Sequence, residues 1–332
     1  MLKTIGVTFP KSSQWHKDQI GLMQSIGTQI ESKFPSANNV LINMTWFGQQ
    51  FENHEYMKFY NYYCTNNIDN LFLLASEDPC FYNRNDTRAL FAESGAKALY
   101  LLGHFDSEHS FNFHSTVLQK YFHTYTEAQL LMQQPKYTFV NYNRKPRDHR
   151  TKFVHMLDNK NLSDLGIVTL GDDRTLNETV EEIGKENQWW DEEHGIPHDI
   201  HSLGRLDIWQ NHFLTVVSET DYEDFLWTFI TEKTWKPILG LRPFVINGQT
   251  AVYKWLTDRG FRTFNKYWRH INLETCDIDD IHLNICSVIK FLHTQNLAQM
   301  YLDMIPDLRY NKLRFDEFSK EQQTKMGNIF DY

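Results

Sequence analysis

The stretch YTFVNYNRKPRDHRTKFVHML, residues 137–157, contains the two kinds of element that decide the fold. Its first part, residues 137–142, is a short run rich in apolar and aromatic side chains, which predicts a strand. Its last part predicts a helix, because its apolar residues have helical spacing. They are Phe153, Val154, Met156 and Leu157. A polar loop separates the two, so the stretch predicts one strand–loop–helix unit.

The same alternation of short apolar runs with longer helical or polar segments extends along the chain in both directions. The other predicted strands are residues 3–9, 40–46, 70–76, 98–103, 166–170, 213–218 and 243–246. Strands that alternate with helices are typical of parallel sheets built from βαβ units. We therefore expect an α/β fold.

The length of the chain and the restart of the pattern near Pro135 predict two domains, because 332 residues exceed one compact core. We expect two Rossmann-like α/β domains, over residues 1–134 and 135–300, and a C-terminal tail over residues 301–332. The polar, acidic segment 172–200 is typical of a surface insertion. Two such domains facing a central cleft would bind ligands at the C-terminal ends of their strands.

The composition, with 41% hydrophobic and 23% charged residues, is typical of a soluble protein. No apolar run approaches the roughly 18 to 20 residues that a membrane span needs. The four cysteines lack CxxC spacing, which favours a reducing compartment, and the N-terminus lacks the pattern of a signal peptide. We therefore expect no membrane span and a cytoplasmic location, the host cytoplasm if the protein is viral. A net charge of −9 argues against a nucleic-acid-binding surface of large extent.

The loop of residues 143–150 concentrates positive charge directly after the predicted strand 137–142. Its cationic side chains and histidine are Arg144, Lys145, Arg147, His149 and Arg150. A loop that leads into a helix adds backbone N–H donors to such side chains, and this combination commonly holds phosphate. The alternative is a solvated loop paired with the many carboxylates of the chain. The position after a strand favours phosphate binding.

The segment FITEKTWKPILGLRPFVING, residues 229–248, predicts a second ligand-binding element. Thr231 is expected to cap a short helix, which places Glu232 and Lys233 in its first turn. The helix dipole favours the glutamate there and disfavours the lysine. Lys233 is therefore a candidate to bind a ligand's negative charge.

These elements together resemble the second domain of GT-B-type glycosyltransferases. The closest group is the fucosyltransferase-like α1,3 group with its viral and bacterial relatives. The matching elements, in chain order, are Asn143 to Arg150, Ser218-Glu219-Thr220, Thr231-Glu232-Lys233, Arg242-Pro243-Phe244 and Gly260-Phe261-Arg262-Thr263-Phe264. The resemblance covers residues 137–265 only.

The resemblance implies a nucleoside diphosphate sugar as the donor substrate, with no resident cofactor and no metal. Its diphosphate would be neutralised by Lys233 together with Arg144, Arg147 or Arg150, in the place that a metal holds in other transferases. Glu232, and also Glu219, would accept hydrogen bonds from ribose or sugar hydroxyls. Asn143 and Thr231 lie in the same motifs and are expected at the donor site. Inversion at the sugar is implied by the resemblance alone.

A general base for the acceptor hydroxyl is expected on the first domain. The candidates are Glu77, Asp78, Glu93, Asp106 and Glu108. Position at a strand end favours Glu77 with Asp78 and Asp106 with Glu108 equally, and Glu77 is the first choice. The neighbouring histidines, His104 and His109, match no standard metal-ligand spacing, so no metal site is expected.

The predicted function is transfer of a sugar from a nucleoside diphosphate sugar to an acceptor hydroxyl of a glycan, a small molecule or modified DNA. One alternative is a DNA-modifying glycosyltransferase that acts on a hydroxymethylated base. Another is a non-catalytic glycosyltransferase-like protein with a binding or structural role. Motifs typical of nucleoside triphosphatases, dinucleotide enzymes and α/β-hydrolases do not occur in the sequence.

Overall fold

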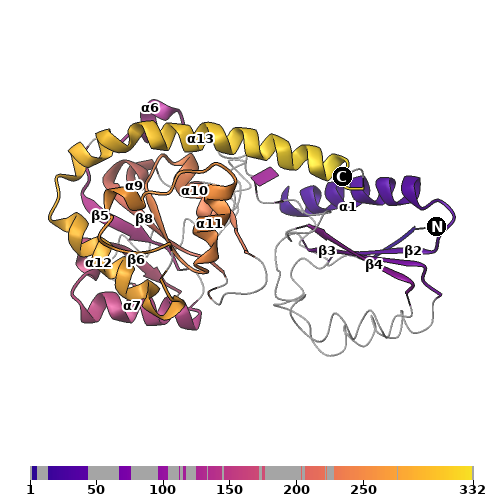
Figure 1. Cartoon of the computed structure of the whole chain (residues 1–332), viewed down its shortest axis with the longest axis horizontal. Helices are drawn as coiled ribbons and strands as arrows, with labels where there is room; N and C mark the ends of the chain where they lie inside the picture. Colours follow the sequence, from indigo (N-terminus) through magenta and orange to yellow (C-terminus); the bar gives the residue numbers. More distant parts are fainter. Residues whose placement is uncertain are drawn as a thin grey trace. The chain divides into compact units, whose positions relative to one another are not determined.

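The structure is a computed structural model of the chain, and it divides into two compact units (Figure 1). It describes residues 2–5, 14–43, 67–75, 96–103, 112, 115–116, 125–132, 134–143, 146–171, 174–175, 203, 206–220, 222, 228–274 and 276–330. The first unit comprises residues 1–117 and 319–332, and the second comprises residues 118–318. The structure thus divides at 117/118 rather than at the expected 134/135.

The described part of the first unit contains a parallel sheet in the order β1-β2-β3-β4. Its strands are β1 (Leu2–Ile5), β2 (Asn39–Asn43), β3 (Asn70–Ala75) and β4 (Ala98–Gly103). Helix α1 (Gln14–Lys33) joins β1 to β2 and lies along one face of this sheet (Figure 1). It buries Leu22, Ile26 and Ile30, which recur at helical spacing.

The expected tail over residues 301–332 is instead mostly helical, since α13 spans Leu297–Gly327. Its residues 297–318 belong to the second unit, and the residues from Ser319 onward belong to the first. In the first unit, the amide of Gln29 donates to the carbonyl of Met326 at 3.0 Å, and the Phe330 ring packs edge-on against Phe72. The end of the chain is therefore part of the packing of the first unit.

The described part of the second unit contains a sheet in the order β7-β6-β5-β8-β9. Its strands are β5 (Tyr137–Asn141), β6 (Gly166–Leu170), β7 (Arg174–Thr175), β8 (His212–Ser218) and β9 (Phe244–Asn247). The pairs β5–β6, β5–β8 and β8–β9 are parallel, and β7 is antiparallel to β6. After β6 the chain returns to the opposite side of β5, so β5 and β8 flank the point where the strand order reverses. Doubly wound sheets bind ligands at this point.

Helices lie on both faces of this sheet, with α7 and α12 on one side and α10, α11 and α13 on the other (Figure 1). The described helices of the unit are α6 (Glu127–Leu130), α7 (Asp148–Asn159), α9 (Leu206–Asn211), α10 (Glu232–Leu239), α11 (Ala251–Asp258), α12 (Ile281–His293) and the part of α13 before Ser319. Its described 3-10 turns are η3 (Ser163–Leu165), η4 (Asn265–Tyr267) and η5 (Ile278–Asp280). The mixed α/β architecture with parallel sheets is compatible with the predicted α/β fold. Among the described residues, no helix has the length and apolar character that crossing a membrane requires.

Aromatic rings join α10 to α13. The Trp235 side chain is fully buried, and its ring lies 5.4 Å from Phe261, 5.3 Å from Phe315 and 5.5 Å from Phe318, measured between centroids. The Gly260–Phe264 element, one of the motifs that carry the resemblance, thus packs against α13. The Arg262 guanidinium adds an ion pair to Asp307 of α13 at 2.8 Å.

Gly240→Ala is expected to destabilise the second unit, because α10 and α9 meet without room for a methyl group. A Cβ atom at Gly240 would lie 2.3 Å from the Trp209 ring, although the backbone φ of −80° suits any residue. Overpacking of this kind costs about 1–3 kcal/mol, measurable by urea unfolding. Gly21→Ala is the matched control, because in the described part of the chain no heavy atom lies within 4 Å of a Cβ there. That change should stabilise helix α1 slightly, and equal stability of the two variants would contradict the account.

Candidate functional site

Several of the predicted site residues lie outside the described residues. They are the candidate bases Glu77, Asp78, Glu93, Asp106 and Glu108, and the cations Arg144 and Lys145. The other candidates, including Glu232 and Lys233, gather at the carboxyl edge of the second sheet, where β5, β8 and β9 end.

A buried network of side-chain amides lines this edge. Asn141 donates to the Ser218 hydroxyl at 2.9 Å, and Asn247 donates to the same oxygen at 3.3 Å. Asn143 donates its side-chain N–H groups to Asn141 Oδ1 at 2.5 Å and to the Thr169 carbonyl at 2.9 Å. Its Oδ1 atom is buried and finds no hydrogen-bond partner among the described residues. Asn143 therefore keeps one acceptor for a ligand hydroxyl or for water.

Arg147 and Arg150 of the basic loop donate hydrogen bonds to the chain at the end of β8. Arg150 is only 4% exposed and donates to the carbonyls of Ser218 and Glu219, at 3.2 and 2.9 Å. Arg147 is half-buried and donates to the carbonyl of Thr220 at 2.9 Å. Arg150 thus has a structural position, holding the strand end, whereas the sequence offered it as a diphosphate ligand.

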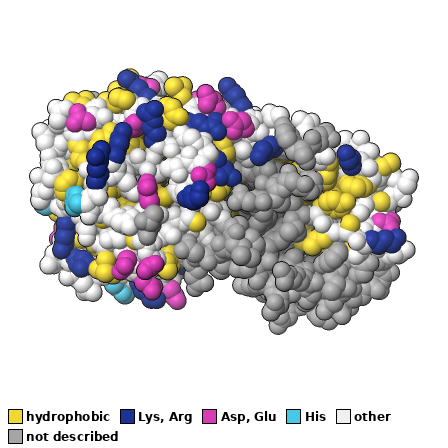
Figure 2. All heavy atoms as spheres, in the orientation of Figure 1, with side chains coloured by type: hydrophobic (Ala, Val, Ile, Leu, Met, Phe, Trp, Pro, Cys, Tyr) yellow, Lys and Arg dark blue, Asp and Glu magenta, His cyan; other side chains and the backbone are white. Residues whose placement is uncertain are grey.

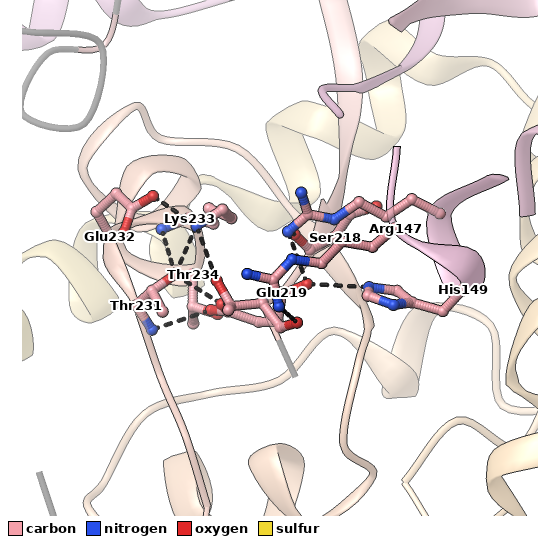
Figure 3. Close-up of polar contacts among 10 residues, drawn as sticks. Arg147, His149, Ser218, Glu219, Thr231, Glu232, Lys233 and Thr234 are labelled. Atoms are coloured by element: carbon pink, nitrogen blue, oxygen red, sulfur yellow. Dashed lines mark hydrogen bonds and ion pairs between the residues drawn. The ribbon is translucent and has the colours of Figure 1, made fainter. Parts of the chain in front are cut away.

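The carboxylate of Glu219 is fully buried at the start of α10 (Figure 3). Its Oε1 accepts from the backbone N–H of Thr231 at 3.1 Å and from the Thr234 hydroxyl at 2.7 Å. Its Oε2 accepts from the Thr231 hydroxyl at 2.6 Å and from the N–H of Thr220 at 3.3 Å. Each carboxylate oxygen thus accepts two hydrogen bonds, which occupies all the lone pairs that a carboxylate offers. Glu219 therefore fixes α10 instead of offering a free acceptor to a sugar.

Helix α10 begins as the sequence predicted. Thr231 is its N-cap, and the Thr231 hydroxyl accepts from the Lys233 N–H at 3.3 Å. The Lys233 ammonium donates to Glu232 Oε1 at 2.6 Å, to Thr231 Oγ1 at 3.2 Å and to Thr220 Oγ1 at 3.4 Å. The Lys233 side chain is 30% exposed and that of Glu232 is 9% exposed, so the cation is the more accessible member of the pair.

The two predicted motifs meet at Thr220. Arg147 contacts its carbonyl and Lys233 contacts its side chain, although the two cations come from different loops of the sheet edge. Elsewhere, charges of both signs are interspersed on the face of the second unit seen in Figure 2. The ion pairs Lys254–Asp258 and Arg309–Glu127 are exposed and contribute little to stability. The two cations at Thr220 differ from these surface ion pairs, because they meet where the strand order of the second sheet reverses, between β5 and β8.

Sequence reasoning missed an aromatic stack beside the site. The Tyr222 ring lies between His149 and His282, at 5.1 Å from each, and its hydroxyl donates to the Ile278 carbonyl at 2.6 Å. Burial lowers the pKa of His149 to about 4 and that of His282 to about 4. His149 is therefore neutral near pH 7 and adds no charge to the basic loop. No motif marks the stack, because Tyr222 and His282 are far apart in the sequence.

Folding stability is expected to fall as the pH drops from 6.5 toward 4. Burial lowers the pKa of His149, His282 and the fully buried His212 below 6.5, the last to about 3. In this window the unfolded chain binds protons that the folded protein does not. Each histidine thus removes up to about 1.4 kcal/mol per pH unit, and the contribution is complete only above pH 6.5.

Urea unfolding at pH 7.5 and at pH 5.0 measures this dependence. His282→Gln should reduce the slope that the described histidines contribute by about one third, since one of their three buried members is removed. An unfolding free energy that stays constant between the two pH values would contradict the account.

The fold and the site define an α/β protein that carries a polar, cation-bearing site at the switch point of a doubly wound sheet. Comparisons of the chain with protein-family models, with curated proteins and with solved structures find no match. Among the described residues, no group of three or more histidine, cysteine, aspartate or glutamate side chains is placed to hold a metal ion.

Proposed function

We propose that this protein is a glycosyltransferase that moves a sugar from a nucleoside diphosphate sugar to an acceptor hydroxyl. One observation carries the proposal: Arg147 and Lys233, from two separate motifs, contact the same residue, Thr220. This meeting point lies at the sheet edge between β5 and β8, where doubly wound folds bind nucleotides.

Departure of a nucleoside diphosphate develops negative charge on its phosphates, and fixed cations at that place stabilise the transition state. Arg147 suits bidentate contact with a phosphate, and Lys233 supplies a compact second charge. With Arg144, these side chains would take the place of a metal. Glu232 and the buried acceptor of Asn143 are the groups proposed to bind ribose or sugar hydroxyls.

The remaining parts of the proposal rest on the resemblance and on the sequence. The two units would form a GT-B arrangement, and the general base would be Glu77, Asp78 or Asp106. The reaction would invert the sugar, and the protein would act in the cytoplasm, that of a host if it is viral.

A thermal-shift screen with UDP-, GDP-, ADP- and CMP-linked sugars in the presence of EDTA tests the proposal. A ligand at 100 times its Kd stabilises the folded state by about 2.7 kcal/mol, so one donor should raise the Tm clearly. The shift should disappear in Lys233→Ala. No shift with any donor would contradict the proposal and favour a non-catalytic role.

A further inference from the structure

The start of α10 contains a capping arrangement completed from another strand. In an ordinary capping box, the third helical residue is Glu or Gln, and its side chain accepts from the N–H of the N-cap. Here the N-cap is Thr231 and the third residue is Thr234, which has no carboxylate. Glu219, at the end of β8, accepts from the Thr231 N–H instead, and Thr234 donates to the same oxygen.

This arrangement fixes the direction in which the Thr231 hydroxyl points. A hydroxyl has one hydrogen and two acceptor lone pairs. Its hydrogen goes to Glu219 Oε2 at 2.6 Å, since a carboxylate only accepts. Its lone pairs are then left for the backbone N–H of Lys233 at 3.3 Å and the Lys233 ammonium at 3.2 Å. Glu219 thus makes Thr231 an acceptor toward Lys233.

We infer that Glu219 is a positioning residue, which orients the Lys233 ammonium for a nucleoside diphosphate through Thr231 without touching the ligand. The inference rests on the proposed function, because Lys233 is its point of action. The strand end that carries Glu219 is itself held, since Arg150 and Arg147 donate to consecutive carbonyls from Ser218 to Thr220. Of the three acceptors of the Lys233 ammonium, the Thr231 hydroxyl is therefore the one whose direction Glu219 fixes, and the Thr220 hydroxyl and Glu232 are the other two.

Glu219→Gln preserves the shape and reverses this polarity. The new amide nitrogen would take the position of Oε2, because the fixed donor there, the Thr220 N–H at 3.3 Å, is farther away than the Thr231 N–H, which lies 3.1 Å from Oε1. The Thr231 hydroxyl on that side can rotate and become an acceptor. The hydroxyl hydrogen would then point toward the Lys233 ammonium, which repels it. We expect the Kd for a nucleoside diphosphate to rise about tenfold, as for the loss of one charge-assisted hydrogen bond.

Two buried threonines provide matched variants, because both hydroxyls donate to Glu219 but only Thr231 also contacts Lys233. Thr231→Val should weaken nucleotide binding about as much as Glu219→Gln, and Thr231→Ser should restore it. Thr234→Val should lower the Tm while changing the Kd less than either. Thr231→Val also serves if Glu219→Gln fails to fold, which circular dichroism would reveal.

The test is calorimetric titration of the full chain and its variants with UDP, GDP, ADP and CDP. A double-mutant cycle separates positioning from simple stabilisation: in a Lys233→Met background, Glu219→Gln should cause no further loss of affinity. An equal further loss in that background overturns the inference. The inference is also overturned if Glu219→Gln and Thr231→Val both bind the nucleotide with wild-type affinity. If Lys233→Met binds it weakly in the same experiment, the proposed function stands. No binding by the wild type overturns both.

Discussion

Lys233→Ala is expected to lower sugar transfer by about 10²–10³-fold, the loss typical when one group that stabilises developing negative charge is removed. The ammonium lies at the sheet edge and is partly exposed, so the fold does not depend on it as a core group. The change should therefore reduce the release of nucleoside diphosphate from the donor while leaving the Tm close to that of the wild type.

Lys236→Ala is the control for this prediction. Lys236 lies in the last turn of the same helix, five residues after the N-cap Thr231, and is also half-buried. Its removal should leave transfer within about twofold, as for a residue outside the charge-stabilising site. Equal losses of transfer in Lys233→Ala and Lys236→Ala would show that the effect comes from the general loss of positive charge. Normal transfer by Lys233→Ala would contradict the proposed role of Lys233.

Arg242→Ala is expected to lower the free energy of unfolding by about 3–5 kcal/mol, because each buried acceptor left without a donor costs about 1–3 kcal/mol. The guanidinium is fully buried and donates to the carbonyls of His212 at 3.0 Å and Leu130 at 2.9 Å, and to the Tyr301 hydroxyl at 2.9 Å. Burial lowers its pKa to about 10, so it remains charged at neutral pH. Truncation would leave several buried acceptors without a donor.

Urea unfolding of Arg242→Ala beside Arg269→Ala measures this effect. Arg269 is exposed and donates from Nε to the carbonyl of Lys266 at 3.2 Å, so its loss should change stability by no more than about 0.5 kcal/mol. A cost below 1 kcal/mol for Arg242→Ala would show that the surrounding carbonyls find other partners.

The local elements were predictable because their signals are local. The strand over residues 137–141 and the cap at Thr231 follow from side-chain type and spacing over a few residues. The helix α13 was missed although Tyr301, Met304 and Leu308 recur at helical spacing and are buried. The interior Pro306 and the polar surroundings of these residues hid the pattern.

The roles of the charged residues could not be predicted from the sequence, because they depend on contacts between distant segments. Arg147 and Arg150 occur in one motif, yet Arg150 is turned into the protein and Arg147 reaches Thr220. Glu219 resembled a ligand-binding acid until its oxygens were found bonded to the start of α10. The order of the sheet, which brings β5 beside β8, decides all three outcomes.

The central claim is that cations at Thr220, in place of a metal, bind the diphosphate of the donor. Titration of the wild type and of Lys233→Ala with UDP, GDP, ADP and CDP in EDTA tests it most directly. The account predicts that one nucleotide binds the wild type without a metal and binds the variant at least about tenfold more weakly. Equal affinity of the two proteins, or no binding by the wild type, would contradict it.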